Sequence, residues 1–223
     1  MKTAFVLFHR MTALDLVGVY DPVTRLKSMG LMDELSFDLC ALTPEVSDDR
    51  GLGIVAHRVD EPLADYDLLI VPGGFGSVEL ERDAAFLDWR RSAAPVPLKA
   101  TVCTGSVLLG AAGFLTGRRA TTHPTQFENL RPYCGEVVDE RVVDEGDVVT
   151  SRGVSAGLDL GLHRVERGAG ADARDTKARQ MGEPYSWRGG ARSQRDARES
   201  THAGPGVEAR RRAIADGGQA APR

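Results

Sequence analysis

The residue best suited to chemistry is Cys103, which ends a short apolar run and precedes the helix-start residues Thr104-Gly105-Ser106. A thiol between a buried strand and a helix N-terminus lies near unpaired N–H groups and the positive end of the helix dipole. Most buried free cysteines are small packing residues. A strand-to-helix turn favours a nucleophile instead, and it predicts a thiol pKa below the ~8.5 of a free cysteine.

A glycine-rich turn, Pro72-Gly73-Gly74-Phe75-Gly76, follows the preceding apolar run. Glycine lets the backbone N–H groups of such a turn approach a ligand closely. With the N–H of Thr104, Gly73 and Gly74 can form an oxyanion hole, in which each donor lowers a barrier by ~3–4 kcal/mol. The alternative is a turn whose glycines only make room for the next helix.

Two further residues are candidate proton carriers. Asp15 follows the first apolar run and lies between Leu14 and Leu16. A partly buried carboxyl has a raised pKa and can act as general acid or base beside a thiol, whereas the alternative is an N-cap for the following helix. His123 follows the Cys103 helix by a short strand. It either pairs with the thiol or is a loop histidine hydrogen-bonded to the backbone.

The composition excludes several function classes. The chain has 223 residues, a net charge of −4 and 42% hydrophobic residues, which suit one substantial domain. The acidic balance gives no reason to expect nucleic acid, no run approaches the ~18 apolar residues of a membrane span, and the N-terminus reads as a strand rather than a signal peptide. Cys40, Cys103 and Cys134 show no metal-type spacing. We therefore expect a cytoplasmic, reducing setting, with no metal and no organic cofactor.

Strands alternate with helices along the chain, which predicts an α/β fold with a mainly parallel sheet covered on both faces. Apolar patterning predicts strands over Thr3–Phe8, Leu35–Leu42, Ile54–Val59, Asp67–Val71, Ala100–Cys103, Glu136–Val143 and Asp147–Ser151. The last two are joined by the hairpin signal Asp144-Glu145-Gly146. Helices are predicted over Leu14–Met29, Ser77–Ala94 (with Ser77 as a possible cap), Thr104–Leu115, Ser155–Glu166 and Ala171–Met181.

The composition changes near Gly189. Residues 189–223 contain no aromatic side chain, and their large aliphatic residues are Val207 and Ile214. Such a segment buries too little apolar area to offset its ordering entropy, so we predict one folded domain over 1–188 and a disordered tail over 189–223.

From Phe5 to about Trp187 the chain resembles the ThiJ/PfpI superfamily (the DJ-one-like proteins), and within it the isonitrile hydratase group. The resemblance rests on the segment from Val102 to His123, on Val71-Pro-Gly-Gly, on Leu14-Asp-Leu-Val-Gly18 and on Gly153-Val-Ser-Ala-Gly-Leu-Asp159. It implies a flavodoxin-like, class I glutamine amidotransferase-like three-layer sandwich and a homodimer. Similar domains occur as the ligand-sensing halves of AraC-type regulators.

The resemblance also implies roles for individual residues. Cys103 would be the nucleophile, Asp15 its acidic partner, and Gly74 and Thr104 the oxyanion-binding site. The implied function is a cysteine-dependent hydratase or hydrolase acting on a small electrophilic substrate, best matched by isonitrile hydration to N-substituted formamides. A glyoxalase- or amidase-like enzyme, a redox or stress sensor and a ligand-binding module are the alternatives.

The sequence departs from the family pattern in places. Pro124 follows His123, where an aromatic residue is usual, and Arg164 and Gly168 stand where similar proteins carry apolar residues. Because glycine costs a helix about 1 kcal/mol relative to alanine, these positions predict weak helices at the end of the domain.

Overall fold

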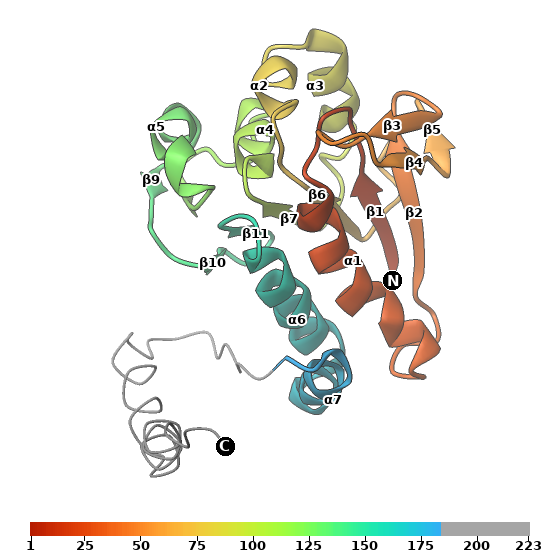
Figure 1. The fold of residues 1–223 in the computed structure, drawn as a ribbon. Helices are drawn as coiled ribbons and strands as arrows, with labels where there is room; N and C mark the ends of the chain where they lie inside the picture. Colours follow the sequence, from red (N-terminus) through yellow and green to blue (C-terminus); the bar gives the residue numbers. More distant parts are fainter. Residues whose placement is uncertain (184–223) are drawn as a thin grey trace, which may run out of the picture. The chain divides into compact units, whose positions relative to one another are not determined.

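A seven-stranded sheet forms the centre of the computed structural model, which describes residues 1–183 (Figure 1). The predicted domain end at 188 and the predicted disordered tail over 189–223 lie outside the described residues. All neighbouring strands are parallel except β10 and β11. The strands, in their order across the sheet, are β10 (Val142–Asp144), β11 (Val148–Ser151), β7 (Leu98–Val102), β6 (Leu68–Val71), β1 (Lys2–Val6), β2 (Ser36–Ala41) and β5 (Arg58–Val59).

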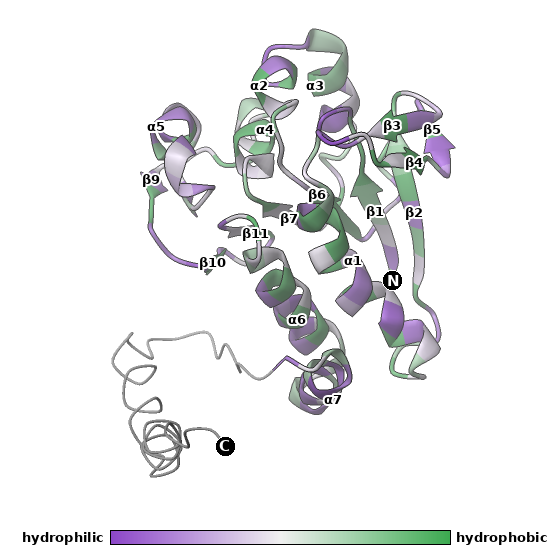
Figure 2. Cartoon of the chain, viewed as in Figure 1, coloured by the Kyte–Doolittle hydropathy of each residue, from purple (hydrophilic) through white to green (hydrophobic). Residues whose placement is uncertain are grey.

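The central strands are apolar because helices cover both faces of the sheet. Every residue of β6 and of β11 is buried, and Figure 2 shows the arrowhead end of β1 as hydrophobic. Strands buried on both sides read as continuous apolar runs, which is the pattern that the sequence shows. Two small two-stranded sheets lie outside the main one, formed by β3 (Glu45–Ser47) with β4 (Gly53–Val55), and by β8 (Arg119–Ala120) with β9 (Glu136–Val137).

The order of the strands reverses between β1 and β6. The chain moves from β1 to β2 in one direction and from β6 to β7 in the other, so right-handed crossovers place their helices on opposite faces. One face carries α1 (Ala13–Ser28), α6 (Ala156–Ala169) and α7 (Ala171–Met181); α1 packs on α6, and α6 on α7. The other carries α2 (Ser77–Leu80), α3 (Ala84–Arg91), α4 (Gly105–Ala111) and α5 (Phe127–Leu130), with short 3-10 turns at Pro124–Gln126 and Arg131–Tyr133. This is the flavodoxin-like three-layer arrangement, and ligands bind at such a reversal point, beyond the carboxyl ends of the strands.

Two predicted helices have different limits in the structure. The predicted helix Ser77–Ala94 is two helices, because the Asp83 side chain accepts the N–H of Phe86 at 2.8 Å and caps a new helix there. Ser77 is the first residue of α2 rather than its cap, and its Oγ donates to the carbonyl of Gly74 at 2.7 Å. The helix predicted to end at Leu115 ends at Ala111.

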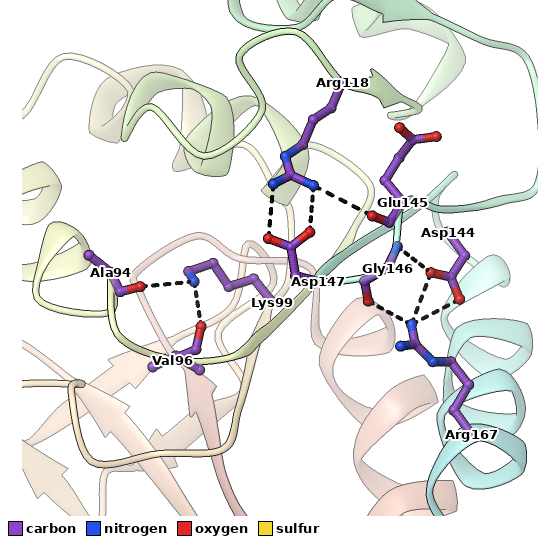
Figure 3. A network of polar contacts seen from close by, with 9 residues as sticks. All are labelled: Ala94, Val96, Lys99, Arg118, Asp144, Glu145, Gly146, Asp147 and Arg167. Atoms are coloured by element: carbon purple, nitrogen blue, oxygen red, sulfur yellow. Dashed lines mark hydrogen bonds and ion pairs between the residues drawn. The ribbon is translucent and has the colours of Figure 1, made fainter.

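The predicted hairpin at Asp144-Glu145-Gly146 is confirmed. Its turn precedes Val148, which pairs with Lys99 near the start of β7, so the turn lies at the opposite end of that strand from Cys103. Figure 3 shows how this turn is held: Arg167 donates to the Asp144 carboxylate and to the Gly146 carbonyl, each at 2.9 Å. Arg118 forms a two-point ion pair with Asp147. These contacts hold the turn that leads into the first residue of β11.

The last two helices form over their predicted positions, although they bury charged side chains. Lys177 is fully buried, and its Nζ donates to Asp21 Oδ2 at 2.6 Å and to Gln180. Arg164, one of the departures from the family pattern, is also buried, and its Nε and Nη1 have no hydrogen-bond partner among residues 1–183. The domain therefore ends on helices that bury charge, an arrangement less stable than apolar packing.

Candidate active site

Cys103 lies at a sharp turn between β7 and α4. Its φ is +57°, in the left-handed region that non-glycine residues rarely adopt and that is characteristic of a nucleophile elbow. The turn also requires Gly105, because a Cβ at that position would lie 2.3 Å from the carbonyl oxygen of Val71. The elbow predicted from the sequence is present.

Buried hydroxyl groups fix the backbone of this elbow. Thr122 Oγ1 and Ser106 Oγ donate to the carbonyl of Cys103, at 2.8 and 3.3 Å, while the Cys103 N–H donates to the carbonyl of Ser151 at 3.0 Å. Each of these side chains is buried. Since carbonyl and N–H are both held, the sulfur has little freedom to move away from its neighbours.

Asp15 is an acid beside the thiol and not a helix cap. Thr12 is the N-cap residue of α1, and Asp15 lies in the first turn, fully buried. Its Oδ2 accepts the N–H of Gly73 at 3.1 Å, and the Cys103 thiol also interacts with the carboxyl. Burial raises the pKa of Asp15 to about 7, although the Gly73 N–H and the thiol oppose this shift. A group with this pKa can both accept and donate a proton at neutral pH.

The predicted lowering of the Cys103 pKa is wrong. The pKa of this thiol is raised to about 12, chiefly by burial and also by the negative charge of Asp15, whereas the N–H of Thr104 acts in the opposite direction. Loss of hydration outweighs the start of a helix that is only seven residues long. To react as a thiolate near neutral pH, this thiol would need a base, and the Asp15 carboxyl is the ionisable group in contact with it.

The glycine turn contacts both catalytic candidates through its backbone. The N–H of Gly73 donates to Asp15, and the N–H of Gly74 donates to Thr104 Oγ1 at 2.9 Å. The Thr104 hydroxyl donates in turn to the carbonyl of Gly74 at 3.2 Å. A Cβ at Gly73 would lie 2.5 Å from the Thr104 nitrogen, so glycine is required for this close approach. The turn thus positions Asp15 and Thr104. The N–H groups of Gly73 and Gly74 already have these side chains as acceptors, so neither is free to donate into the cavity.

His123 lines the same cavity as Cys103, but no hydrogen bond between the two is present in residues 1–183. Its Nδ1 accepts the N–H of Thr125 at 3.4 Å and lies 2.8 Å from Thr125 Oγ1. Because Nδ1 accepts a hydrogen bond, the proton of the neutral ring is on Nε2. The loop-histidine reading of the sequence is therefore the one that the hydrogen bonds support, with the ring on the wall of the cavity.

The cavity above Cys103 has a volume of about 300 Å³. Cys103, Thr104 and His123 contribute to its lining, together with Phe75 and Val154 from two other loops. In the described part of the chain, no cluster of His, Cys, Asp and Glu could hold a metal ion. No helix within residues 1–183 is long and apolar enough to cross a membrane.

One residue of the site was not singled out from the sequence. Gly153 lies against the thiol: a Cβ there would be 2.6 Å from Cys103 Sγ. It follows β11, the strand next to β7, so its place at the same edge of the sheet was the signal available in the sequence.

Comparison with known proteins agrees with this geometry. A model of the DJ-1/PfpI family matches residues 1–167. The chain is 36% identical over 174 residues to the isonitrile hydratase of Pseudomonas putida, covering 77% of this chain and 74% of that protein.

Solved structures have the same fold. A ThiJ/PfpI family protein from Pseudomonas syringae superposes with a TM-score of 0.74 at 28% identity, covering 90% of this chain and 84% of the other. An AraC family transcriptional regulator from Pseudomonas putida superposes with a TM-score of 0.69 at 22% identity, covering 81% and 98%.

Proposed function

We propose that this chain, which belongs to the DJ-1/PfpI family, hydrates isonitriles to N-substituted formamides with Cys103 as its nucleophile. The observation that carries the proposal is the buried pair of Cys103 and Asp15, whose carboxyl has a pKa of about 7. Similarity to an isonitrile hydratase supports this substrate class. The reaction needs a nucleophile for the terminal carbon and one group that moves protons, and this pair supplies both.

The first half of the reaction forms a thioimidate. Asp15, as the carboxylate, takes the thiol proton while Cys103 Sγ bonds to the terminal carbon of R–N≡C. Asp15 then delivers this proton to the same carbon, which gives R–N=CH–S–Cys103 and restores the carboxylate. Proton transfer of this kind contributes about 10²–10⁴-fold to a rate.

The second half adds water. Asp15 removes a proton from the water as its oxygen bonds to the thioimidate carbon, and the proton passes to the nitrogen. The C–S bond then breaks, the hydroxyl proton returns to the sulfur through Asp15, and R–NH–CHO leaves. The sum is one isonitrile and one water converted to one formamide, with no net oxidation or reduction.

Thr104 and His123 hold the polar atoms in this scheme. The Thr104 hydroxyl donates its proton to the Gly74 carbonyl, so its oxygen is the proposed acceptor for a hydrogen of the attacking water, and Gly74 acts through Thr104. The Nε2–H of His123 is the proposed donor from the cavity wall. Gly73 acts on Asp15 rather than on substrate.

A homodimer in a reducing, cytoplasmic setting is part of the proposal. The three cysteines are free thiols, and α1 exposes Leu14 and Val17. Exposed apolar residues close together mark surfaces that proteins bury in assemblies. Light scattering of the purified chain measures its mass in solution, and the mass of a monomer would contradict the proposed homodimer.

Turnover of a substrate panel tests the function. Methyl and cyclohexyl isonitrile, methylglyoxal and simple amides are offered to the wild type, to Cys103→Ser and to the control Cys134→Ser. We expect formamide from the isonitriles, loss of it in Cys103→Ser, and wild-type turnover in Cys134→Ser. Turnover of methylglyoxal or amides alone would assign a glyoxalase- or amidase-like enzyme, and no turnover at all would favour a sensor or ligand-binding protein.

A further inference from the structure

The cavity above Cys103 has an apolar wall at its mouth that the proposed chemistry does not use. Phe75 is 64% exposed and Val78 is 57% exposed, and both line the cavity. Phe75 lies in the turn just before α2, and Val78 lies in its first turn. Large apolar side chains left in water at the mouth of a reactive pocket indicate a surface that a ligand covers.

The backbone on both sides of Phe75 is fixed. Before it, the N–H of Gly74 donates to Thr104 Oγ1, and the carbonyl of Gly74 accepts from the hydroxyls of Thr104 and Ser77. After it, the N–H of Gly76 donates to the carbonyl of Arg10 at 3.1 Å. The backbone that carries the ring is therefore held at the mouth before any ligand arrives, so binding would not have to order this loop.

A third apolar side chain lies on the same cavity. Val154 is half-buried and follows Gly153, the residue that lies against Cys103 Sγ. The charged side chains at the rim, Arg50 and Asp49, pair with each other at 2.9 Å, so they leave no net charge to attract an ionic group. The mouth of the cavity thus favours an apolar ligand.

The shape of an isonitrile fixes which part of it meets this wall. Its carbon, nitrogen and first substituent atom are collinear. When the terminal carbon is at the sulfur of Cys103, on the buried side of the cavity, the N-substituent must point toward the mouth. It then lies against Phe75, Val78 and Val154.

Resting on the proposed hydratase activity, we infer that Phe75 and Val78 determine specificity, selecting isonitriles whose N-substituent is apolar and larger than methyl. The test compares kcat/KM for cyclohexyl and methyl isonitrile in the wild type, Phe75→Ala, Phe75→Leu and Val78→Ala. Val55→Ala is the matched control, because Val55 is 67% exposed and does not line the cavity.

We expect Phe75→Ala to lower kcat/KM for cyclohexyl isonitrile by about 10-fold or more, the usual effect of lost apolar contact in a pocket. Methyl isonitrile, which does not reach the wall, should change less than about twofold on the same reasoning. Val78→Ala should shift the ratio in the same direction, Phe75→Leu should recover most of the loss, and Val55→Ala should match the wild type. Equal losses on both substrates, or no loss on either, would overturn the inference.

The inference and the hydratase proposal can fail separately. If the wild type turns over neither isonitrile, the hydratase proposal fails, and calorimetry with N-cyclohexylformamide and N-methylformamide tests the wall instead. Tighter binding of the cyclohexyl compound that Phe75→Ala weakens by about 10-fold would support the wall as an apolar subsite. Equal binding, or none, would overturn it.

Discussion

Replacing Asp15 by Asn tests whether the buried carboxyl takes up a proton near neutral pH. Burial raises the pKa of Asp15 from 3.8 to about 7, so between these pH values the folded protein holds a proton that the unfolded chain has released. The stability of the folded state therefore falls as the pH rises through this window, and the contribution of the neutral carboxyl is fully present only below it. Asn has the same shape and can accept the Gly73 N–H, but it does not ionise.

The size of the effect follows from the two pKa values. The difference between 3.8 and about 7 corresponds, at 1.36 kcal/mol for each pH unit, to about 4 kcal/mol. Of this, about 2.5 kcal/mol falls between pH 5 and pH 8. The free energy of unfolding of Asp15→Asn, relative to the wild type, should grow by this amount across that range.

Urea unfolding at pH 5, 6, 7 and 8 measures this difference for the wild type, Asp15→Asn and the control Asp88→Asn. Asp88 is on the surface, with a side chain that is 72% exposed, and its variant should follow the wild type at every pH. Carboxyls with lowered pKa values, such as Asp21 and Asp144, titrate in all three proteins and cancel in the comparison. A constant difference between Asp15→Asn and the wild type from pH 5 to pH 8 would refute the assignment of the high pKa to Asp15.

Four further outcomes follow from these and other contacts of the described residues. The kcat/KM for isonitrile should rise with pH to a plateau above about 7, because Asp15 becomes the carboxylate. Asp15→Asn should lower kcat by about 10²-fold or more. A wild-type kcat in this variant would leave Asp15 with a structural role only. Gly153→Ala places a methyl against Cys103 Sγ and should lower kcat by about 10²-fold with the fold retained by circular dichroism, whereas unchanged kcat would show that the sulfur moves freely. Arg90 is fully buried, and its three guanidinium nitrogens have no hydrogen-bond partner among residues 1–183, although the group lies 5.8 Å from the centre of the Phe86 ring. Arg90→Met should therefore raise the free energy of unfolding by about 1 kcal/mol or more. The neighbouring surface variant Arg91→Met should change it by less than about 0.5 kcal/mol, and a destabilised Arg90→Met would contradict the reasoning.

The elbow at Cys103 could be predicted from sequence because its signals are local. A buried run, one thiol and a helix start with Gly105 are adjacent in the chain, and the structure joins them with a left-handed residue. The parallel sheet was predictable for the same reason, since each strand is a short apolar run bounded by turn residues. The helix over Ser77–Ala94 was not divided, because its pattern continues through Asp83 and only the side-chain cap shows the break.

The chemistry of Asp15 depends on residues far along the chain. A helix N-cap and a buried acid look alike in sequence. The difference here is the hydrogen bond that Asp15 accepts from the N–H of Gly73, which is 58 residues away. The direction predicted from sequence for the Cys103 pKa shift is wrong for a related reason. Burial of the thiol depends on Gly153 and on the loop after β11, neither of which a reading of the local sequence takes into account.

The glycine turn hydrogen-bonds to the proposed acid, and this contact affects the pH at which the proposed reaction would proceed. The Gly73 N–H lowers the pKa of Asp15 against the effect of burial. Without this hydrogen bond the carboxyl would have a pKa above about 7, and a smaller fraction would be available as a base for the Cys103 thiol at neutral pH. Because that thiol has a pKa of about 12, its reactivity depends on the base and not on spontaneous ionisation. One backbone N–H from the loop after β6 therefore lowers the pKa of an acid on α1 that we propose as the base for the nucleophile after β7.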